Sequence, residues 1–127
     1  MKYTILYIDD EEVNLRIFRS VFRREFKIFT APSGKEGLEI LSHEKCDLIV
    51  TDQRMPGMTG LEFLKRVYHM LPSKPPNRII LSGYSSSIDI DKARKEYGLY
   101  KFVSKPWNAE DLKVIMNTAI KDCFRKK

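Results

Sequence analysis

The sequence is poor in the residues that mark several classes of protein. It has two cysteines, Cys46 and Cys123, and two histidines among 127 residues. Neither a CxxC pair nor histidines at ligand spacing accompany them, which argues against a disulfide framework or a zinc site. Six glycines and six prolines are too few for a collagen-like or low-complexity chain. The first apolar run, residues 3–8, is too short for a membrane span or a signal peptide, so we expect a cytoplasmic protein.

Composition and charge are those of one ordinary globular domain. The chain is 43% hydrophobic and 31% charged, and a chain of this length can bury roughly two-thirds of its unfolded surface in a single core. We therefore expect one domain over residues 1–127. The net charge of +6 could suggest nucleic-acid binding, but the basic residues are interleaved with apolar ones, as on solvated helix faces. An acidic partner surface or an attached domain is the alternative, and we expect no contact with nucleic acid or membrane.

Short apolar runs alternate with segments of helical period. Four runs, at residues 3–8, 47–51, 77–82 and 100–104, stand out, and a fifth at 26–30 is weaker. The central runs are continuous, as in strands that are buried on both faces of a parallel sheet. Strand–helix–strand connections of this length are parallel and right-handed. The pattern, a strand and a helix repeated five times, predicts a doubly wound α/β domain.

The segments between these runs carry the apolar stripes and start signals of helices. Three stripes have the spacing of a helix face that packs on a core: Val13, Ile17, Val21 and Phe22; Leu61, Leu64, Val67, Tyr68 and Leu71; and Leu112, Ile115, Met116, Ala119 and Ile120. Four residues precede an acid by three positions and are expected to cap helices: Ser33, Thr59, Ser86 and Asn108.

Polar residues stand where the predicted strands end. Asp9 and Asp10 end the first strand, Asp52 the third and Ser82 the fourth, and Lys105 follows the fifth. In such sheets the carboxyl ends of the strands form one edge, where ligands bind. Three carboxylates within about 5 Å would repel by roughly 3 kcal/mol per pair at an effective dielectric of about 20. The lysine, or a hard divalent cation such as Mg²⁺, is expected to compensate them.

The same residue types suit phosphoryl chemistry. A carboxylate can attack phosphorus and form an aspartyl phosphate. Such a step needs a metal, a fixed cation and a hydroxyl donor around the transferred group. Asp52 is the candidate acceptor, and the other strand-end residues supply the helpers.

Four motifs in this order resemble the receiver domain of two-component response regulators: YIDDEE, DQRMPGMTGLEFL, LSGY and KFVSKPW. The resemblance extends along the whole chain and implies a flavodoxin-like (βα)5 fold, with five parallel strands in the order 2-1-3-4-5. It implies that Asp52 takes a phosphoryl group from a phosphohistidine of a sensor histidine kinase or phosphotransfer protein, with no enzymatic activity beyond self-phosphorylation and self-dephosphorylation. The chain could be free-standing or the N-terminal part of a longer regulator. Its DQRMPGM and KPW motifs resemble receivers attached to transcriptional activators and cyclic-dinucleotide phosphodiesterases, so an output domain in cis or a partner protein is expected.

The resemblance also implies a role for each residue of the site. It implies a site for Mg²⁺, or Mn²⁺ in its place, with these ligands: Asp9 through water, Asp10, Asp52 and the backbone carbonyl of Arg54. Ser82 and Lys105 would bind the phosphoryl oxygens. The Lys105–Pro106 peptide would be cis, a form that costs little only before proline.

Ser82 and Phe102 are the expected switch residues. Phosphorylation adds a charge of about −1.5 to −2 and three acceptors, so Ser82 would move toward the phosphate and vacate space for the Phe102 ring. The family often has tyrosine at this place, whose hydroxyl can report to a partner. Phenylalanine should therefore act through packing alone. The affected surface is the face made by the fourth helix, fifth strand and fifth helix, which could also form a homodimer.

Two further side chains are candidates for setting the lifetime of the phosphate. Arg54 lies two residues after the acceptor, and Tyr84 lies two residues after Ser82. Both could overhang the phosphate and limit attack by water. We expect alanine at these positions to change the rate of dephosphorylation.

Three other functions share part of this pattern. A phosphatase of haloacid-dehalogenase type uses Asp, Ser or Thr, Lys and Mg²⁺, but has a second acid where this chain has Arg54, and the chain has no cap insertion long enough to enclose a substrate. A receiver-like scaffold that only binds a partner would not need the complete set of acids, hydroxyl and lysine. An FMN protein of flavodoxin type needs a phosphate-binding loop where DDEE places negative charge.

Overall fold

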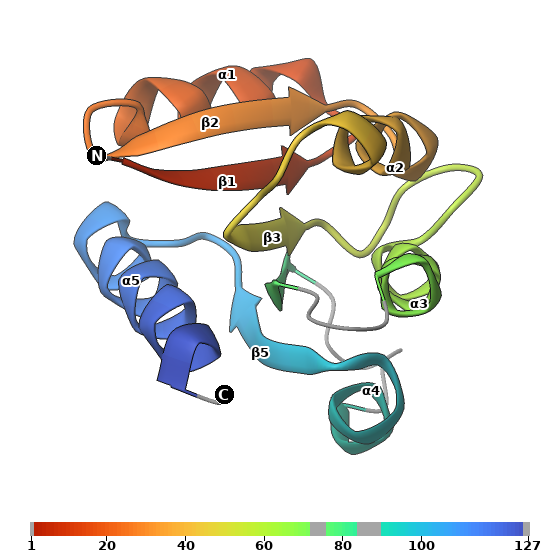
Figure 1. Ribbon diagram of the computed structural model, residues 1–127. Helices are drawn as coiled ribbons and strands as arrows, with labels where there is room; N and C mark the ends of the chain where they lie inside the picture. The colour runs from red at the N-terminus through yellow and green to blue at the C-terminus, as the bar shows by residue number, and fades with distance from the viewer. Residues whose placement is uncertain (1, 72–75, 84–89, 126–127) are drawn as a thin grey trace.

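Five parallel strands form one sheet at the centre of the molecule (Figure 1). The computed structural model describes residues 2–71, 76–83 and 90–125. The strands have these bounds: β1 Tyr3–Ile8, β2 Phe26–Ala31, β3 Leu48–Thr51, β4 Asn77–Ser82 and β5 Leu99–Ser104. The order is β2-β1-β3-β4-β5, and every neighbouring pair is parallel. The predicted fold class and strand order are therefore confirmed.

Helices cover both faces of this sheet. They have these bounds: α1 Glu12–Phe22, α2 Gly34–His43, α3 Gly60–Met70, α4 Ile90–Tyr97 and α5 Ala109–Arg125. Helices α1 and α5 lie on one face, and α2, α3 and α4 lie on the other (Figure 1). Within the described ranges, no helix has both the length and the apolar character needed to cross a membrane.

Two hydrophobic cores follow from this three-layer arrangement. The core under α1 and α5 is rich in aromatic rings, with Tyr7, Phe18 and Phe22 all buried. The core under α2, α3 and α4 is built mainly from aliphatic residues around Phe63. Every residue of β3 is buried, because the strand lies in the middle of the sheet with helices above and below. This double coverage explains why the central runs are continuously apolar.

Three of the four predicted helix caps are present. The Ser33 hydroxyl accepts a hydrogen bond from the Glu36 amide over 3.2 Å, and Asn108 Oδ1 accepts one from the Asp111 amide over 3.0 Å. Thr59 at the start of α3 forms a reciprocal capping box with Glu62. Such caps satisfy amide groups that have no partner within their own helix. The fourth predicted cap, Ser86, lies outside the described residues.

The predicted core stripe of α1 is wrong except for its last residue. Val13, Ile17 and Val21 are 63%, 47% and 40% exposed. The residues that α1 buries are Leu15, Phe18 and Phe22. Both sets have helical spacing, so periodicity alone does not decide which one faces the sheet. The predicted core stripe of α3 is wrong at Tyr68, which is exposed.

Candidate functional site

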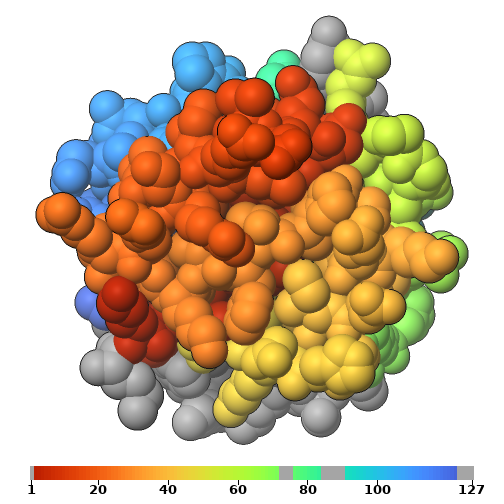
Figure 2. Space-filling view, turned by 90° about the horizontal axis from the view of Figure 1, so that it is seen from above, coloured from red at the N-terminus to blue at the C-terminus, as the bar shows by residue number. Residues whose placement is uncertain are grey.

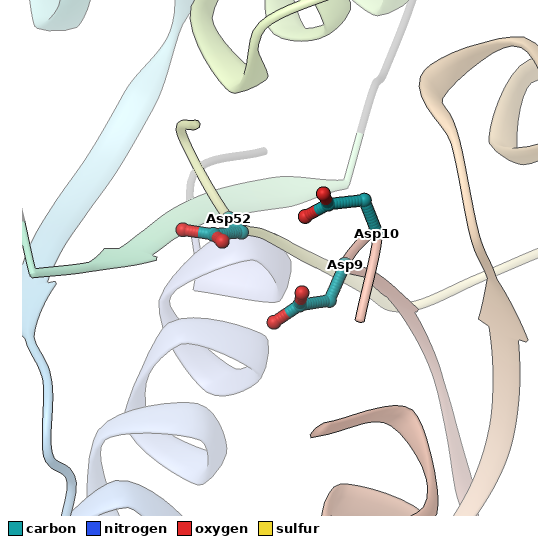
Figure 3. Close-up of side chains that lie close together, drawn as sticks. All are labelled: Asp9, Asp10 and Asp52. Carbon is teal, nitrogen blue, oxygen red and sulfur yellow. The ribbon is translucent and has the colours of Figure 1, made fainter. Parts of the chain in front are cut away.

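Three aspartates meet at the carboxyl edge of the sheet, as predicted. Strands β1 and β3 are neighbours, with Ile8 paired to Thr51, so the residues that follow them lie side by side. Oxygen atoms of Asp9, Asp10 and Asp52 all lie within 4.8 Å of one another (Figure 3). The Asp9 and Asp52 side chains are buried, and Asp10 is exposed. The cluster is therefore open to solvent on the Asp10 side.

Lys105 brings one positive charge to these acids. Its Nζ lies 3.1 Å from Asp9 Oδ2 and 3.5 Å from Asp52 Oδ2. Its backbone amide donates to the carbonyl of Ser82 over 3.1 Å, and the Lys105–Pro106 peptide is cis. One ammonium does not neutralise three carboxylates, so negative charge remains in excess. Oxygen ligands with excess negative charge are what a hard divalent cation such as Mg²⁺ prefers, and the residues fit that ion.

Asp9 is held by two side-chain donors, Tyr7 and Asn14, that lie outside the predicted set of site residues. The hydroxyl of Tyr7 donates to its Oδ2 over 2.7 Å, and the amide of Asn14 donates to the same oxygen over 3.1 Å. Burial and, next, the charge of Asp9 raise the pKa of Tyr7, so the phenol stays protonated and acts as a donor. The alternation of side chains along β1 could have indicated Tyr7, since residues two apart point to the same face.

The loop after β3 is folded back onto Asp52. The backbone amide of Gln53 donates to Asp52 Oδ1 over 2.8 Å. The Gln53 side chain accepts from the amide of Leu61 over 2.8 Å, and its carbonyl accepts from the amide of Gly60 over 3.0 Å. A Cβ atom at Gly60 would lie only 2.3 Å from the carbonyl oxygen of Asp52. The start of α3 therefore packs directly against the backbone of the candidate phosphate acceptor.

The other predicted site residues differ in burial and in place. Ser82 is the buried last residue of β4, paired with Ser104 of β5. Phe102 lies beside Ile80 on the neighbouring strand and is half-buried against the core under α2, α3 and α4. Arg54 is exposed in the loop after the acceptor. Tyr84, the second candidate for setting the phosphate lifetime, lies outside the described residues.

A hollow of about 600 Å³ opens next to the acids. It lies between α1 and the start of α5, two segments that adjoin each other on the surface seen in Figure 2. Lys105 and Tyr7 reach it from the site, and Ile17 and Val21 line it from α1. Trp107 closes the other side and packs on Phe22, with ring centroids 5.4 Å apart.

The family model of the response regulator receiver domain matches residues 5–117. This chain belongs to the response-regulator receiver family. The receiver domain is thus a module of two-component signalling. Its fold, its acidic edge and its lysine agree with that assignment.

Relatives of the receiver domain include longer regulators and stand-alone domains. It is 37% identical over 117 residues to a hydrogenase transcriptional regulatory protein, HoxA, of Bradyrhizobium diazoefficiens, covering 92% of this chain but 24% of that protein. It is 30% identical to sporulation initiation phosphotransferase F of Bacillus subtilis, covering 89% of this chain and 90% of that protein. The signal receiver domain of an HD domain-containing protein from Pseudomonas fluorescens superposes with a TM-score of 0.89 at 26% identity, covering 98% and 99% of the two chains. The chain spans about a quarter of the length of the HoxA relatives.

Proposed function

We propose that Asp52 accepts a phosphoryl group from a phosphohistidine of a sensor histidine kinase or phosphotransfer protein. The observation that carries this proposal is a buried aspartate at the end of β3 that faces a lysine ammonium 3.5 Å away and two further acids. A carboxylate oxygen of Asp52 forms a bond to phosphorus as the phosphorus–nitrogen bond of the donor breaks, and the imidazole leaves. The chemistry of the domain is confined to its own phosphorylation and dephosphorylation.

The acids are proposed to hold Mg²⁺, or Mn²⁺ in its place. Bound there, the cation supplies positive charge that offsets the charge of the acids and of the phosphoryl group. The proposed ligands are Asp10, Asp52, the backbone carbonyl of Arg54 and, through water, Asp9. The indirect role of Asp9 is supported by its hydrogen bonds, because its Oδ2 already accepts from Tyr7, Asn14 and Lys105.

Ser82 and Lys105 are proposed to bind the phosphoryl oxygens. Lys105 is within reach of Asp52 already, and Ser82 ends the strand next to β3. Movement of Ser82 toward the phosphate would leave space for the ring of Phe102. That ring is half-buried against the core under α2, α3 and α4. Its rotation would reshape the face formed by α4, β5 and α5, through which the domain could also pair with a second copy.

Arg54 and Tyr84 are proposed to set the lifetime of the phosphate. Arg54 is exposed two residues after the acceptor, where its side chain could overhang the phosphate. The test is to time dephosphorylation of Arg54→Ala and Tyr84→Ala after the phosphate donor is removed. Rates equal to that of the wild type would dispose of this role.

The partner that supplies phosphate is proposed to dock on α1. Val13, Ile17 and Val21 are apolar and exposed there, and the last two line the hollow that Lys105 also reaches. Such a surface next to the acids suits an apolar helix face of a kinase or phosphotransfer protein. An output domain in cis is proposed as well, because the chain matches only about a quarter of relatives that are named transcriptional regulatory proteins.

Intact-mass measurement after incubation with acetyl phosphate and Mg²⁺ tests the proposal. We expect one added phosphoryl group in the wild type and none in Asp52→Asn or in the presence of excess chelator. The absence of any adduct would favour a scaffold without phosphorylation. Sustained release of inorganic phosphate from small phosphate esters would favour the phosphatase alternative, which the arginine two residues after Asp52 already disfavours.

A further inference from the structure

Tyr7 joins the acidic cluster to the core under α1. It is the penultimate residue of β1, two positions before Asp9, so the two side chains leave the extended chain on the same face. Its ring stacks on Phe18 of α1, with centroids 4.1 Å apart and planes inclined by 16°. Its hydroxyl donates to Asp9 Oδ2 over 2.7 Å. The tyrosine is 1% exposed, so solvent has little access to compete for this hydrogen bond.

Four protein donors hold the Asp9 carboxylate. An ionised carboxylate offers about four lone-pair sites. Its Oδ1 accepts from the backbone amide of Glu11 over 3.0 Å. Its Oδ2 accepts from Asn14 and Lys105, each over 3.1 Å, and from Tyr7 over the shortest distance. Tyr7 is also the donor with the least freedom, because its ring is stacked and its backbone belongs to a central strand.

We propose that Tyr7 is a positioning residue of the receiver site, whose hydroxyl fixes the orientation of Asp9 and thereby the place of the Lys105 ammonium between Asp9 and Asp52. This inference rests on the proposed function, since it concerns the same cation and phosphoryl site. Without the hydroxyl, Asp9 Oδ2 loses its shortest hydrogen bond and keeps two donors, Asn14 and Lys105. It then draws the ammonium, now 3.1 Å from Asp9 and 3.5 Å from Asp52, further toward Asp9.

The expected effect on cation binding follows from the indirect role of Asp9. Loss of a group that orients the ligands of a metal typically costs about 10–100-fold in affinity. Because Asp9 is proposed to act through water, the low end of this range, about tenfold, is expected.

Tyr7→Phe removes the hydroxyl and keeps the stacked ring. Tyr100→Phe is a matched control, because the Tyr100 hydroxyl donates to Asp122 Oδ2 over 2.5 Å. This is the same kind of bond, but it lies near the start of β5, whereas the acids lie at the carboxyl ends of β1 and β3. Thermal melting followed by circular dichroism checks that both variants fold. Bound Mn²⁺ is counted by electron paramagnetic resonance, and Mg²⁺ is measured by competition with Mn²⁺.

We expect Tyr7→Phe to weaken binding of both cations about tenfold and Tyr100→Phe to leave it unchanged. Unchanged or tighter binding in Tyr7→Phe, or an equal loss in both variants, would overturn the inference. Absence of cation binding in the wild type would instead refute the proposed cation site. A cation-free measurement separates the two failures: the nuclear magnetic resonance signal of the Lys105 ammonium should shift in Tyr7→Phe and not in Tyr100→Phe. An ammonium signal that does not respond to loss of the Tyr7 hydroxyl would overturn the positioning role by itself.

Discussion

Gly60→Ala tests whether the start of α3 fixes the backbone of Asp52. An added Cβ would lie 2.3 Å from the Asp52 carbonyl oxygen and 3.0 Å from the Cα atom of Gln53. Both obstacles are backbone atoms, so neither can turn away as a side chain can. Overpacking of this kind costs about 1–3 kcal/mol, and alanine returns at most about 1 kcal/mol by favouring the helix. We expect a net loss of about 1–2 kcal/mol in the free energy of unfolding, together with slower phosphorylation by acetyl phosphate as Asp52 is displaced.

Gly34→Ala is the matched control, because Gly34 and Gly60 are both the first residue of a helix after a capping hydroxyl residue. Its added Cβ would lie 2.6 Å from Met58 Sδ, and that flexible side chain can move. We expect this variant to be as stable as the wild type and to be phosphorylated at the same rate. Urea unfolding followed by circular dichroism, and intact mass over time, measure the two quantities. If Gly60→Ala also matched the wild type within about 0.5 kcal/mol and in rate, the proposed link between α3 and the acceptor would be wrong.

Three further results are expected. Asp10→Asn should raise the free energy of unfolding in cation-free urea titrations by about 1–2 kcal/mol, because it removes repulsion from two neighbouring acids; a loss of stability would contradict this. Hydrogen bonds with Thr59 hold the pKa of Glu62 below its usual value. The stability that ionised Glu62 contributes is therefore complete above the usual carboxyl pKa and is lost as pH falls through the lowered one. In Glu62→Gln the free energy of unfolding should therefore fall less steeply as the pH is lowered. A pH dependence equal to that of the wild type would count against the capping box. Burial raises the pKa of Cys46 to about 12, so in a Cys123→Ser background a thiol reagent at pH 8 should modify it only after unfolding in urea.

The elements of the fold could be predicted from sequence because each one is indicated by a local signal. The buried central strands are continuous apolar runs, and the caps at Ser33, Thr59 and Asn108 are local motifs. The orientation of α1 could not be predicted, since Val13 and Leu15 begin two equally regular apolar stripes. The choice between them depends on which stripe meets the sheet, and that is a tertiary contact. The exposed stripe, Val13, Ile17 and Val21, is the surface on α1 that is proposed to bind the partner that supplies phosphate.

The charged residues of the candidate site could be predicted from the sequence, but the contacts that hold them in place could not. Strand ends in a parallel sheet are brought together by topology, so Asp9, Asp52 and Lys105 could be placed in one cluster from their positions in the chain. The donor at Tyr7 and the close approach at Gly60 depend on distances of 2.7 Å and 2.3 Å. No sequence motif encodes such distances. The two-residue spacing between Tyr7 and Asp9 indicates only that their side chains point to the same face.

The two buried acids are anchored from opposite sides of the sheet. Asp9 is held by Tyr7, which belongs to the core under α1 and α5. Asp52 is held by the first turn of α3, which belongs to the layer on the other face. Because Lys105 contacts both acids, a displacement of either layer changes the length of one of its ion pairs. Tyr7→Phe and Gly60→Ala should therefore both shift the Lys105 ammonium, the first through the core under α1 and α5 and the second through the layer that contains α3. Because both substitutions act on this ammonium, their effects on cation affinity should depart from additivity, and a double-mutant cycle measures that coupling; additive effects would contradict it.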